Sequence, residues 1–513
     1  MRRFRSGVAL SGLLLVSAAC ADGARDTTAL APDQQAGVDS VFADFDASDV
    51  PGCAVGVVRD GRLVYGRGYG MANLEHGIAL DTRSVFRMGS VGKQFTAGVV
   101  ALLALDGVVD LDADIRTYLP ELPDFGTPVT VRHLIHHTSG YRDYLTLVSL
   151  SGAREDDYYD DADLYRLLTL QEELNFAPGS DHLYSNSGYF LLAQLVLRVT
   201  GRSLADVARE RIFEPLGMPD THYHDHWQRL VPRRATGYAL AERYRPGADG
   251  PEVQDHAWPG YVAGAWAGGR DAFDGSEWVT SVTTLPMIGD GGVFSSVEEM
   301  VPWVAHLMEP RSEVGGGAWH DLVQDRAVLT AGDTLGYAFG LVHGVQRGLP
   351  TFGHGGAFVG YRAAVQTWPG TGTGVVVLCN RADVNPSDLA DRAGAAVLAD
   401  RMEPAPTDED GASGPVRPPP PETRPLAPEV ASAAAGAYHS RELDSVWTLR
   451  VEGDGLRLRQ GRSRGPLLQG GDGDTLVAGR LVLRLERDAR GAVTGFRADA
   501  GRVRNLGFVR EGG

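Results

Sequence analysis

Hydrophobic and polar positions between residues 34 and 402 change period several times, and the changes outline successive strands and helices. The stretch GCAVGVVRDGRLVYGRGYG, residues 52–70, has two apolar runs on either side of a turn at RDG, which predicts a β-hairpin. From Ser90, the stretch SVGKQFTAGVVALLALDG has helical periodicity and stops at a glycine, a usual helix end. Residues 100–300 are predicted to be mostly helices and loops, and SGYFLLAQLVLRVTG is the clearest helix.

Strand patterns return in the last part of this region, in GYAFGLVHG (336–344), AFVGYRAAVQTWP (357–369) and GTGVVVLCN (372–380). The stretch PSDLADRAGAAVLADRM, residues 386–402, is predicted to be a closing helix. Strands at both ends of a helical middle predict one sheet made from both ends of the region. We therefore expect an α/β fold, in which an antiparallel sheet is flanked by helices and a helical subdomain is inserted.

The composition changes after residue 402. Residues 403–426 are acidic and rich in proline, which is typical of a semi-rigid linker. Residues 427–513 alternate with period two, as in VWTLRVEGDGLRLRQG, and glycine and aspartate recur at regular spacing. This pattern predicts a small C-terminal antiparallel β domain that forms a sheet or a barrel.

The first twenty residues have the features of an export signal: the basic start MRRFRSG, the apolar run VALSGLLLV and the small residues SAACADG. The apolar run is too short to span a bilayer stably. Cys20 stands where a bacterial lipoprotein signal has its lipidated cysteine, although Ser17 replaces the commonest leucine. Lipidation at Cys20 and ordinary cleavage after Ala19 or Ala21 both stay open. We expect an exported protein that is periplasmic, lipid-anchored or secreted.

Length, charge and cysteine content add three limits. A chain of 513 residues predicts two or three domains. The net charge of −18 argues against binding nucleic acid or an anionic membrane surface. Besides Cys20, the chain has Cys53 and Cys379, each in an apolar, strand-like run. Export would permit a disulfide between them, but we expect two unpaired buried cysteines unless their strands are neighbours.

The candidate chemistry starts from Lys93, because it is the only lysine and every other basic residue is arginine. Arginine is effectively never deprotonated, whereas a desolvated lysine can act as a base. Lys93 follows Ser90 by three positions at a predicted helix start, which brings both side chains to one face. The S-x-x-K spacing therefore predicts a nucleophile and its base. The alternative is that one lysine survived by chance in an arginine-biased chain.

Further motifs follow in a fixed order: LIHHTSGYRDY, Tyr184-Ser185-Asn186, IFEPLGMPDTHY, GDGGVFSSVEEM and His354-Gly355-Gly356. Together with S-x-x-K, and over roughly residues 35 to 400, they resemble the penicillin-recognising serine hydrolases. That superfamily includes class C β-lactamases, D,D-carboxypeptidases, D-aminopeptidases and related esterases. The resemblance implies a hydrolase that works through an acyl-enzyme and needs no metal or organic cofactor.

The resemblance assigns a catalytic role to three residues. Ser90 is the expected acylated nucleophile, and Lys93 is its proton acceptor. Tyr184 is expected to move protons to the leaving group and to activate water. Whether Lys93 or Tyr184 is the general base stays open.

The resemblance also assigns substrate-binding roles. Asn186 is expected to hold the lysine and the substrate amide. His354 to Gly356 correspond to the strand triad that is K-T-G in class C β-lactamases. The backbone N–H of Ala357 is expected to complete an oxyanion hole with that of Ser90.

The triad departs from K-T-G, because His354 replaces the lysine and Gly355 replaces the hydroxyl residue. A neutral histidine attracts a carboxylate more weakly than a lysine does, and H-x-G is more similar to the esterase and D-aminopeptidase branches. We therefore expect hydrolysis of esters or peptides and poor β-lactamase activity, with a small-molecule or peptide substrate. The alternatives are a β-lactamase or D,D-carboxypeptidase acting on cell-wall-type substrates, and an inactive binding protein of the penicillin-binding type.

Three other features are weighed against plainer explanations. THYHDHW brings together His222, His224 and His226, but its spacing is one residue short of the H-x-H-x-D-H metal motif, so we expect a solvated loop. Trp258, Trp266 and Trp278 either wall the cleft or serve packing. The C-terminal segment, with GRVRNLGFVRE, resembles the lipocalin-like domain of some D-aminopeptidase relatives, where it can approach the cleft and restrict substrates.

Overall fold

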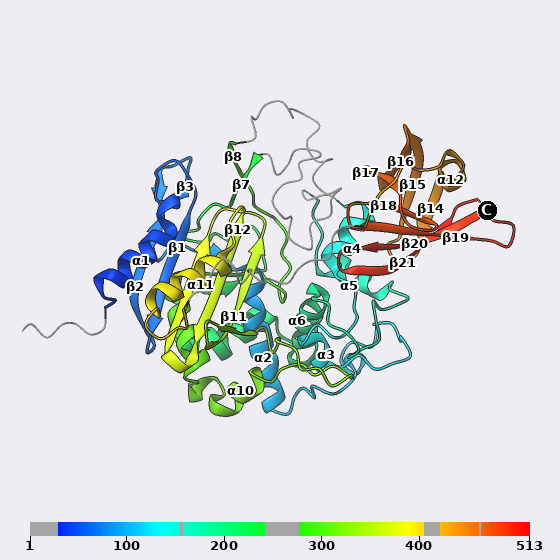
Figure 1. The fold of residues 1–513 in the computed structure, drawn as a ribbon. Coiled ribbons are helices and arrows are strands. Elements are labelled where there is room, and N and C mark those ends of the chain that lie inside the picture. The colour runs from blue at the N-terminus through cyan, green and yellow to red at the C-terminus, as the bar shows by residue number, and fades with distance from the viewer. Residues whose placement is uncertain (1–28, 154–156, 242–275, 405–420, 461–462, 513) are drawn as a thin grey trace, which may run out of the picture.

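The computed structural model describes residues 29–153, 157–241, 276–404, 421–460 and 463–512. Figure 1 shows a part that consists of a sheet and helices, with a β-barrel beside it. The predicted signal segment, residues 1–20, and most of the predicted linker lie outside the described residues. The domain boundaries drawn from the sequence therefore stay predictions.

The sheet has six antiparallel strands in the order β10-β11-β12-β13-β1-β2. Its strands are β1 (Cys53–Arg59), β2 (Arg62–Tyr69), β10 (Val342–Gln346), β11 (Leu349–Phe358), β12 (Tyr361–Trp368) and β13 (Thr373–Cys379). Strand β1, from the N-terminal end, pairs with β13, more than three hundred residues later in the chain. The predicted hairpin and the sheet made from both ends of the region are confirmed.

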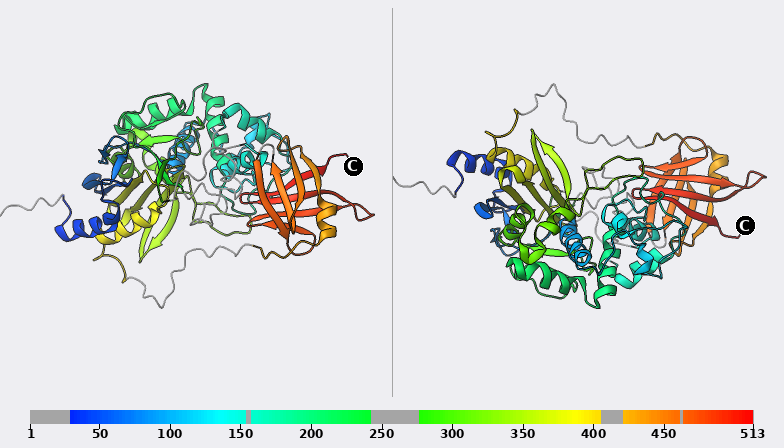
Figure 2. Two further views of the ribbon diagram at one scale, coloured as in Figure 1. Left: turned by 90° about the horizontal axis from the view of Figure 1, so that it is seen from above. Right: turned by 90° about the horizontal axis from the view of Figure 1, so that it is seen from below.

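Successive residues of β1 face two different hydrophobic layers. Cys53, Val55 and Val57 pack in the layer that holds helices α1 (Pro32–Phe42) and α11 (Pro386–Val397). Ala54 and Val58 pack in the larger core, to which α9 (Val297–Met308) contributes. Because both faces are covered, the strand is apolar from Cys53 to Val58. Figure 2 shows this layered part at the end of the molecule opposite the barrel.

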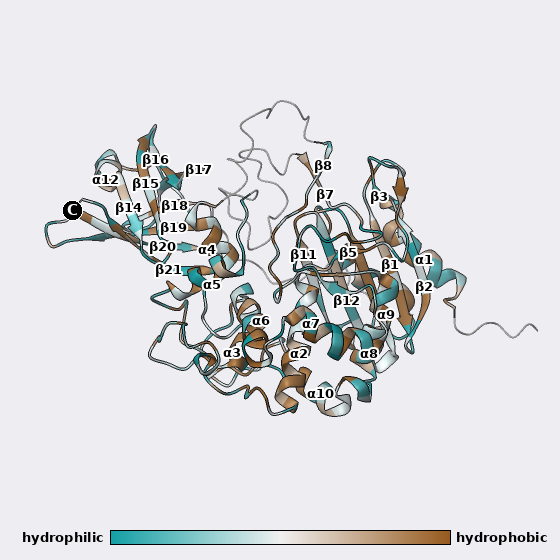
Figure 3. Cartoon of the chain, turned by 180° about the vertical axis from the view of Figure 1, so that it is seen from behind, coloured by the Kyte–Doolittle hydropathy of each residue, from teal (hydrophilic) through white to brown (hydrophobic). Residues whose placement is uncertain are grey.

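The helical middle is built around α2 (Lys93–Leu105) and α6 (Asn186–Thr200), which contact each other. Both helices are apolar on most sides, and Figure 3 shows hydrophobic colouring along them as well as in the sheet. The remaining α-helices of this part are α3 (Val131–Ile135), α4 (Tyr144–Ser151), α5 (Asp161–Thr169), α7 (Leu204–Ala208), α8 (Glu214–Leu216) and α10 (Gly316–Val323). Outside the six-stranded sheet, the short strands among the described residues up to 404 are β3 (Met71–Asn73), β4 (Ile78–Ala79), β5 (Phe86–Arg87), β6 (His222–Tyr223), β7 (Tyr238–Leu240), β8 (Trp278–Thr280) and β9 (Val293–Ser295).

Three sequence predictions differ from the structure in detail. The helix expected from Ser90 begins with a 3-10 turn, Gly89–Gly92, and becomes α-helical at Lys93. The strand expected at 336–344 starts only at Val342, and the residues before it form a loop. Strand β11 was not predicted at its full length, because GHGG has no alternating side chains and the strand is held by pairing with β12.

The C-terminal part is a closed barrel of eight antiparallel strands, which confirms the predicted β domain. The strands are β14 (Gly436–Ser440), β15 (Ser445–Glu452), β16 (Gly455–Gln460), β17 (Ser463–Gly470), β18 (Thr475–Ala478), β19 (Leu481–Arg487), β20 (Val493–Ala500) and β21 (Val503–Arg510), and helix α12 (Pro428–Ala434) precedes them. Rings of Tyr438, Trp447, Phe496 and Phe508 pack on one another in its core.

The barrel is joined to the helical part by a buried arginine. The Arg142 side chain is fully buried and forms an ion pair with Glu442 of the barrel. It also donates hydrogen bonds to the carbonyl oxygens of Arg504 and Asn505, each at 3.0 Å. A buried guanidinium needs such partners, because an unpaired charge is costly to desolvate. The contact therefore fixes the start of β21 against the helical subdomain.

Cys53 and Cys379 form a disulfide, because β1 and β13 are neighbours and the two residues face each other in the register. From the sequence we expect these cysteines to be unpaired unless their strands are neighbours, and the strands are neighbours. The bond ties together residues that are 326 positions apart. Among the described residues, no helix has the length and apolar character needed to cross a membrane.

Replacing both cysteines, Cys53→Ala with Cys379→Ala, is expected to lower the free energy of unfolding by about 3–5 kcal/mol, because the unfolded chain loses a very long cross-link. Denaturant unfolding followed by tryptophan fluorescence measures the change. Wild-type protein unfolded with a reductant serves as the matched control and should approach the variant. Equal stability of the variant and the oxidised wild type would contradict the prediction.

Candidate active site

Ser90 and Lys93 lie together at the start of α2, where the 3-10 turn Gly89–Gly92 passes into the helix. The Lys93 Nζ is 3.2 Å from Ser90 Oγ. It also donates hydrogen bonds to Asn186 Oδ1 at 2.8 Å and to the carbonyl oxygen of Asp290 at 2.6 Å. The Lys93 side chain has no exposed surface. The single lysine of the chain is therefore enclosed, next to the predicted nucleophile and in contact with three separate segments.

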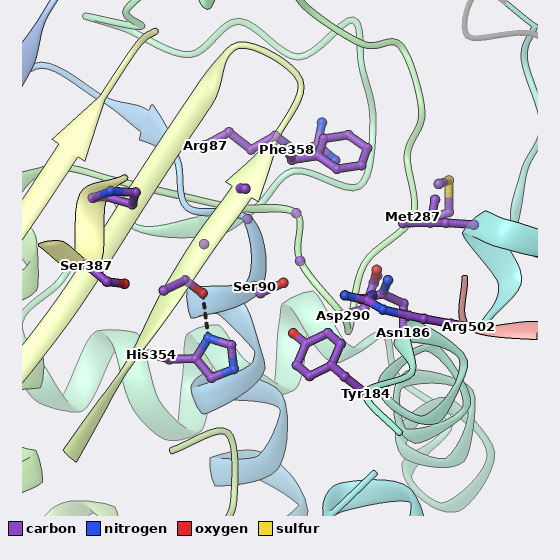
Figure 4. Close-up of a pocket in the computed structure, with 18 of the residues that line it drawn as sticks. Arg87, Ser90, Tyr184, Asn186, Met287, Asp290, His354, Phe358, Ser387 and Arg502 are labelled. Carbon is purple, nitrogen blue, oxygen red and sulfur yellow. Dashed lines mark hydrogen bonds between the residues drawn. The ribbon is translucent and has the colours of Figure 1, made fainter. Parts of the chain in front are cut away.

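Tyr184 is in the loop before α6, and its ring lies over the lysine, with 4.9 Å from Lys93 Nζ to the ring centroid. Its hydroxyl is buried and has no hydrogen-bond partner among the described residues. Figure 4 shows this hydroxyl on the side of the ring that faces Ser90. The His137 ring packs on the tyrosine at 4.1 Å between centroids, and its Nδ1 accepts the Ser185 backbone N–H. His137, which belongs to the LIHHTSGYRDY motif, thus holds the tyrosine in place.

The backbone of strand β11 lies very close to the backbone of the turn that contains Ser90. A Cβ atom added to Gly356 would be 2.1 Å from the Met88 carbonyl oxygen, and one added to Gly89 would be 2.7 Å from Ala357 N. Gly89 also has a φ of +52°, which disfavours other residues. Glycine at both positions lets the Ala357 backbone approach Ser90, as an oxyanion hole made from both segments requires.

His354 points into the same pocket from β11 and is almost fully buried. Its Nε2 is 3.2 Å from the hydroxyl of Tyr337, and its Nδ1 is 2.5 Å from the Gly355 carbonyl oxygen. Burial lowers the pKa of His354 to about 4, and the nearby Lys93 acts in the same direction. The ring is therefore neutral at pH 7, which agrees with the weak grip on carboxylates expected from the sequence.

The pocket is lined by the predicted residues Ser90, Tyr184, Asn186, His354, Gly356 and Ala357. Sequence reasoning missed three further charged residues that line it, Arg87, Asp290 and Arg502. Burial raises the pKa of the Asp290 carboxyl, which accepts a hydrogen bond from Tyr144 at 2.9 Å. Arg87 had one sequence signal, its position three residues before Ser90 and next to an aromatic residue.

Arg502 reaches the pocket from the barrel. It lies in the turn between β20 and β21, and its guanidinium is 4.7 Å from the centroid of the Tyr184 ring. One of its nitrogens is 3.8 Å from Asp143 Oδ2. The barrel therefore contributes a cation to one wall of the pocket. In the sequence this was visible only as the looser resemblance of GRVRNLGFVRE.

The other candidate features lie apart from this pocket. The described residues contain no cluster of three or more His, Cys, Asp or Glu side chains arranged to hold a metal. The expectation of a solvated loop at THYHDHW is wrong in part, because His222 begins β6, which pairs with β9, and His224 is buried. Trp258 and Trp266 lie outside the described residues, while Trp278 packs under the Arg381 guanidinium at 4.8 Å and does not line the pocket.

Comparison with known proteins agrees with this geometry. The beta-lactamase family model matches residues 38–400. A D-aminopeptidase from Gluconobacter oxydans is 31% identical over 313 residues, which cover 61% of this chain and 52% of that protein. A D-aminopeptidase from Brucella canis is 30% identical over 324 residues, covering 62% and 54% of the two chains. The chain thus spans about half the length of the curated relatives it matches.

Solved structures show the same fold. The octameric penicillin-binding protein homologue from Pyrococcus abyssi aligns with a TM-score of 0.58 and 19% identity, over 93% of this chain and 99% of that one. The D-amino acid amidase from Ochrobactrum anthropi, in complex with D-phenylalanine, aligns with a TM-score of 0.56 and 22% identity, over 72% and 100%.

The buried neutral His354 predicts a specific dependence of stability on pH. Below its ordinary pKa of 6.5 the unfolded chain binds a proton that the folded protein does not bind until about pH 4. Stability should therefore fall as pH decreases through this window, by about 3 kcal/mol from this residue. In His354→Asn this contribution is absent, so the difference in unfolding free energy between wild type and variant should shrink from pH 7 to pH 4. A difference that is independent of pH would contradict the assignment.

Proposed function

Because the chain belongs to the beta-lactamase family of serine hydrolases, which it matches over residues 38–400, we propose that it hydrolyses amide or peptide bonds through an acyl-enzyme on Ser90. The observation that carries the proposal is the enclosed contact of Lys93 Nζ with Ser90 Oγ at 3.2 Å. An activated serine requires a base at hydrogen-bond distance, in a site from which water is largely excluded.

In acylation, Lys93 takes the hydroxyl proton of Ser90 while Oγ attacks the substrate carbonyl carbon. A neutral amine has two N–H bonds and one lone pair. Asn186 Oδ1 and the Asp290 carbonyl oxygen accept hydrogen bonds from the two N–H groups of Lys93, so its lone pair is left for the serine proton. We assign the role of base to Lys93 rather than Tyr184, because the Tyr184 hydroxyl makes no hydrogen bond to Ser90.

The backbone N–H groups of Ser90 and Ala357 would hold the oxyanion of the tetrahedral intermediate. As the intermediate collapses, the C–N bond breaks, and Tyr184 passes the proton taken up by the lysine to the leaving amine. Water then attacks the acyl carbon and gives a proton to the Lys93 amine and the Tyr184 hydroxyl, which act together as before. Cleavage of the ester releases the acid, and Ser90 regains its proton.

Relatives and the pocket support one substrate class. Curated relatives include D-aminopeptidases, and a D-amino acid amidase shares the fold. Arg502 of the barrel occupies one wall of the pocket, which favours short substrates. We therefore propose amides or short peptides of D-amino acids. The neutral His354 disfavours β-lactam substrates, whose carboxylate a lysine would grip.

We also propose that the protein works outside the cytoplasm. Support comes from the disulfide between Cys53 and Cys379, since such bonds persist mainly in oxidising compartments. Export is also what the first twenty residues predict. The lipid anchor at Cys20 stays a prediction.

Replacing Lys93 by arginine should lower kcat/KM for a 4-nitrophenyl ester by about 10²- to 10⁴-fold, because arginine keeps a positive charge but cannot accept the serine proton. The reverse exchange Arg392→Lys, at an exposed position of α11, is the control and should leave activity unchanged. Full activity of Lys93→Arg would overturn the assignment of the base.

The substrate class is tested with 4-nitroanilides of D- and L-alanine, a 4-nitrophenyl ester and a chromogenic cephalosporin, all assayed side by side. The D-anilide should be cleaved at least about tenfold faster than the L-anilide and the cephalosporin only slowly, because the neutral His354 offers little attraction for its carboxylate. Ser90→Ala should abolish every activity. Faster turnover of the cephalosporin would favour the β-lactamase alternative, and no turnover of any compound would favour a binding protein.

A further inference from the structure

Arg87 is a buried cation that the proposed mechanism does not use. It lies on β5, lines the pocket, and its residue is only 4% exposed. Within the described part of the chain its guanidinium forms no ion pair, and its Nε is buried without a hydrogen-bond partner. Burial lowers the pKa of Arg87 to about 10, so the side chain stays charged at pH 7.

The surroundings of Arg87 orient it but do not neutralise it. The guanidinium lies 4.7 Å from the ring centroid of Phe358 and 5.9 Å from that of Phe294. Arg234 lies on the Phe294 ring as well, at 5.0 Å, which adds positive charge. Asp290 is the acid in electrostatic range, but its carboxylate binds Tyr144 and is not in ion-pair contact with Arg87. Since a buried unpaired charge is unfavourable, an anion is the partner that this site lacks.

The position of Arg87 in the pocket says which part of a substrate it would meet. Strand β11 runs from His354, past Ala357, to Phe358. Tyr184, which would serve the leaving group, is at the His354 end, with 6.1 Å between their ring centroids. Figure 4 shows Arg87 and Phe358 together at the other end, with Ser90 between the two groups. A substrate that spans the pocket would therefore bring its acyl part to Arg87.

We propose that Arg87 binds a carboxylate in the acyl part of the substrate, so that the preferred D-residue is acidic, such as D-aspartyl or D-glutamyl. The proposal rests on the function proposed above, because the acyl and leaving-group ends are defined by Ser90 and Tyr184. Arg502 is distinct from this site, since it lies over Tyr184 and faces Asp143. The flat guanidinium fork suits a carboxylate, which it can bind through two hydrogen bonds.

The test compares two esters of equal chain length, mono(4-nitrophenyl) glutarate and 4-nitrophenyl pentanoate, which differ in a terminal carboxylate against a methyl group. Wild type should prefer the glutarate. Arg87→Met should lower kcat/KM for the glutarate by about 30-fold and for the pentanoate by less than about threefold, because only the first loses a charge-assisted contact. Arg87→Lys, which keeps the charge without the fork, should give an intermediate value.

Arg234→Met is the matched control, because it removes the cation from the same Phe294 ring without lining the pocket. It should preserve the preference for the glutarate. Thermal unfolding of each variant separates misfolding from loss of a contact. Equal losses for both esters in Arg87→Met, or a wild type that prefers pentanoate, would overturn the proposal.

A binding measurement separates this proposal from the proposed hydrolysis. Glutarate should bind to Ser90→Ala in calorimetric titrations, and the added Arg87→Met substitution should weaken its affinity by at least about tenfold. If no ester is hydrolysed but glutarate binding depends on Arg87, the proposed function fails and the anion site stands. If Arg87→Met leaves glutarate affinity unchanged, the anion site fails whatever the activity.

Discussion

The amine of Lys93 is the point on which the active-site arrangement depends. Its three contacts join the start of α2, the first residue of α6 and the glycine-rich loop at Asp290. Since each partner belongs to a different segment, the lysine aligns them as well as facing Ser90. The surrounding aromatic rings exclude water, which strengthens every polar contact at the site. An arginine could not take up the serine proton, which accounts physically for a lysine at this position.

The barrel is part of the pocket as well as an appended domain. Arg142 and Glu442 anchor it through a buried ion pair, and the same arginine donates hydrogen bonds to carbonyl oxygens at the start of β21. The turn just before β21 places Arg502 over Tyr184. Breaking the ion pair would leave a buried charge without its partner, so moving the barrel away from the pocket costs free energy. The shape of the pocket and the surroundings of Tyr184 therefore depend on a domain that begins more than two hundred residues after the tyrosine.

Short stretches of sequence were enough to predict those elements that depend only on neighbouring residues. The β1–β2 hairpin, α6 and the spacing of Ser90 and Lys93 all follow from period and turn chemistry within short stretches. Strand β11 could not be predicted in this way, because its glycine-rich stretch is extended only through pairing with β12. Arg502 and the disulfide depend on contacts between distant segments, which one sequence without aligned relatives does not reveal. The family resemblance supplied the order of motifs, but it gave no reason to single out Arg87.

If the Lys93 amine activates the Ser90 hydroxyl, that hydroxyl carries the acyl group covalently during turnover. Acid quenching during turnover of a slowly hydrolysed D-amino acid ester, followed by peptide mapping with mass spectrometry, traps this species. The mass of the acyl group is expected on the peptide that contains Ser90, and on no other peptide. Hydrolysis that proceeds without this adduct, or with the acyl group on a different residue, would contradict an acyl-enzyme on Ser90.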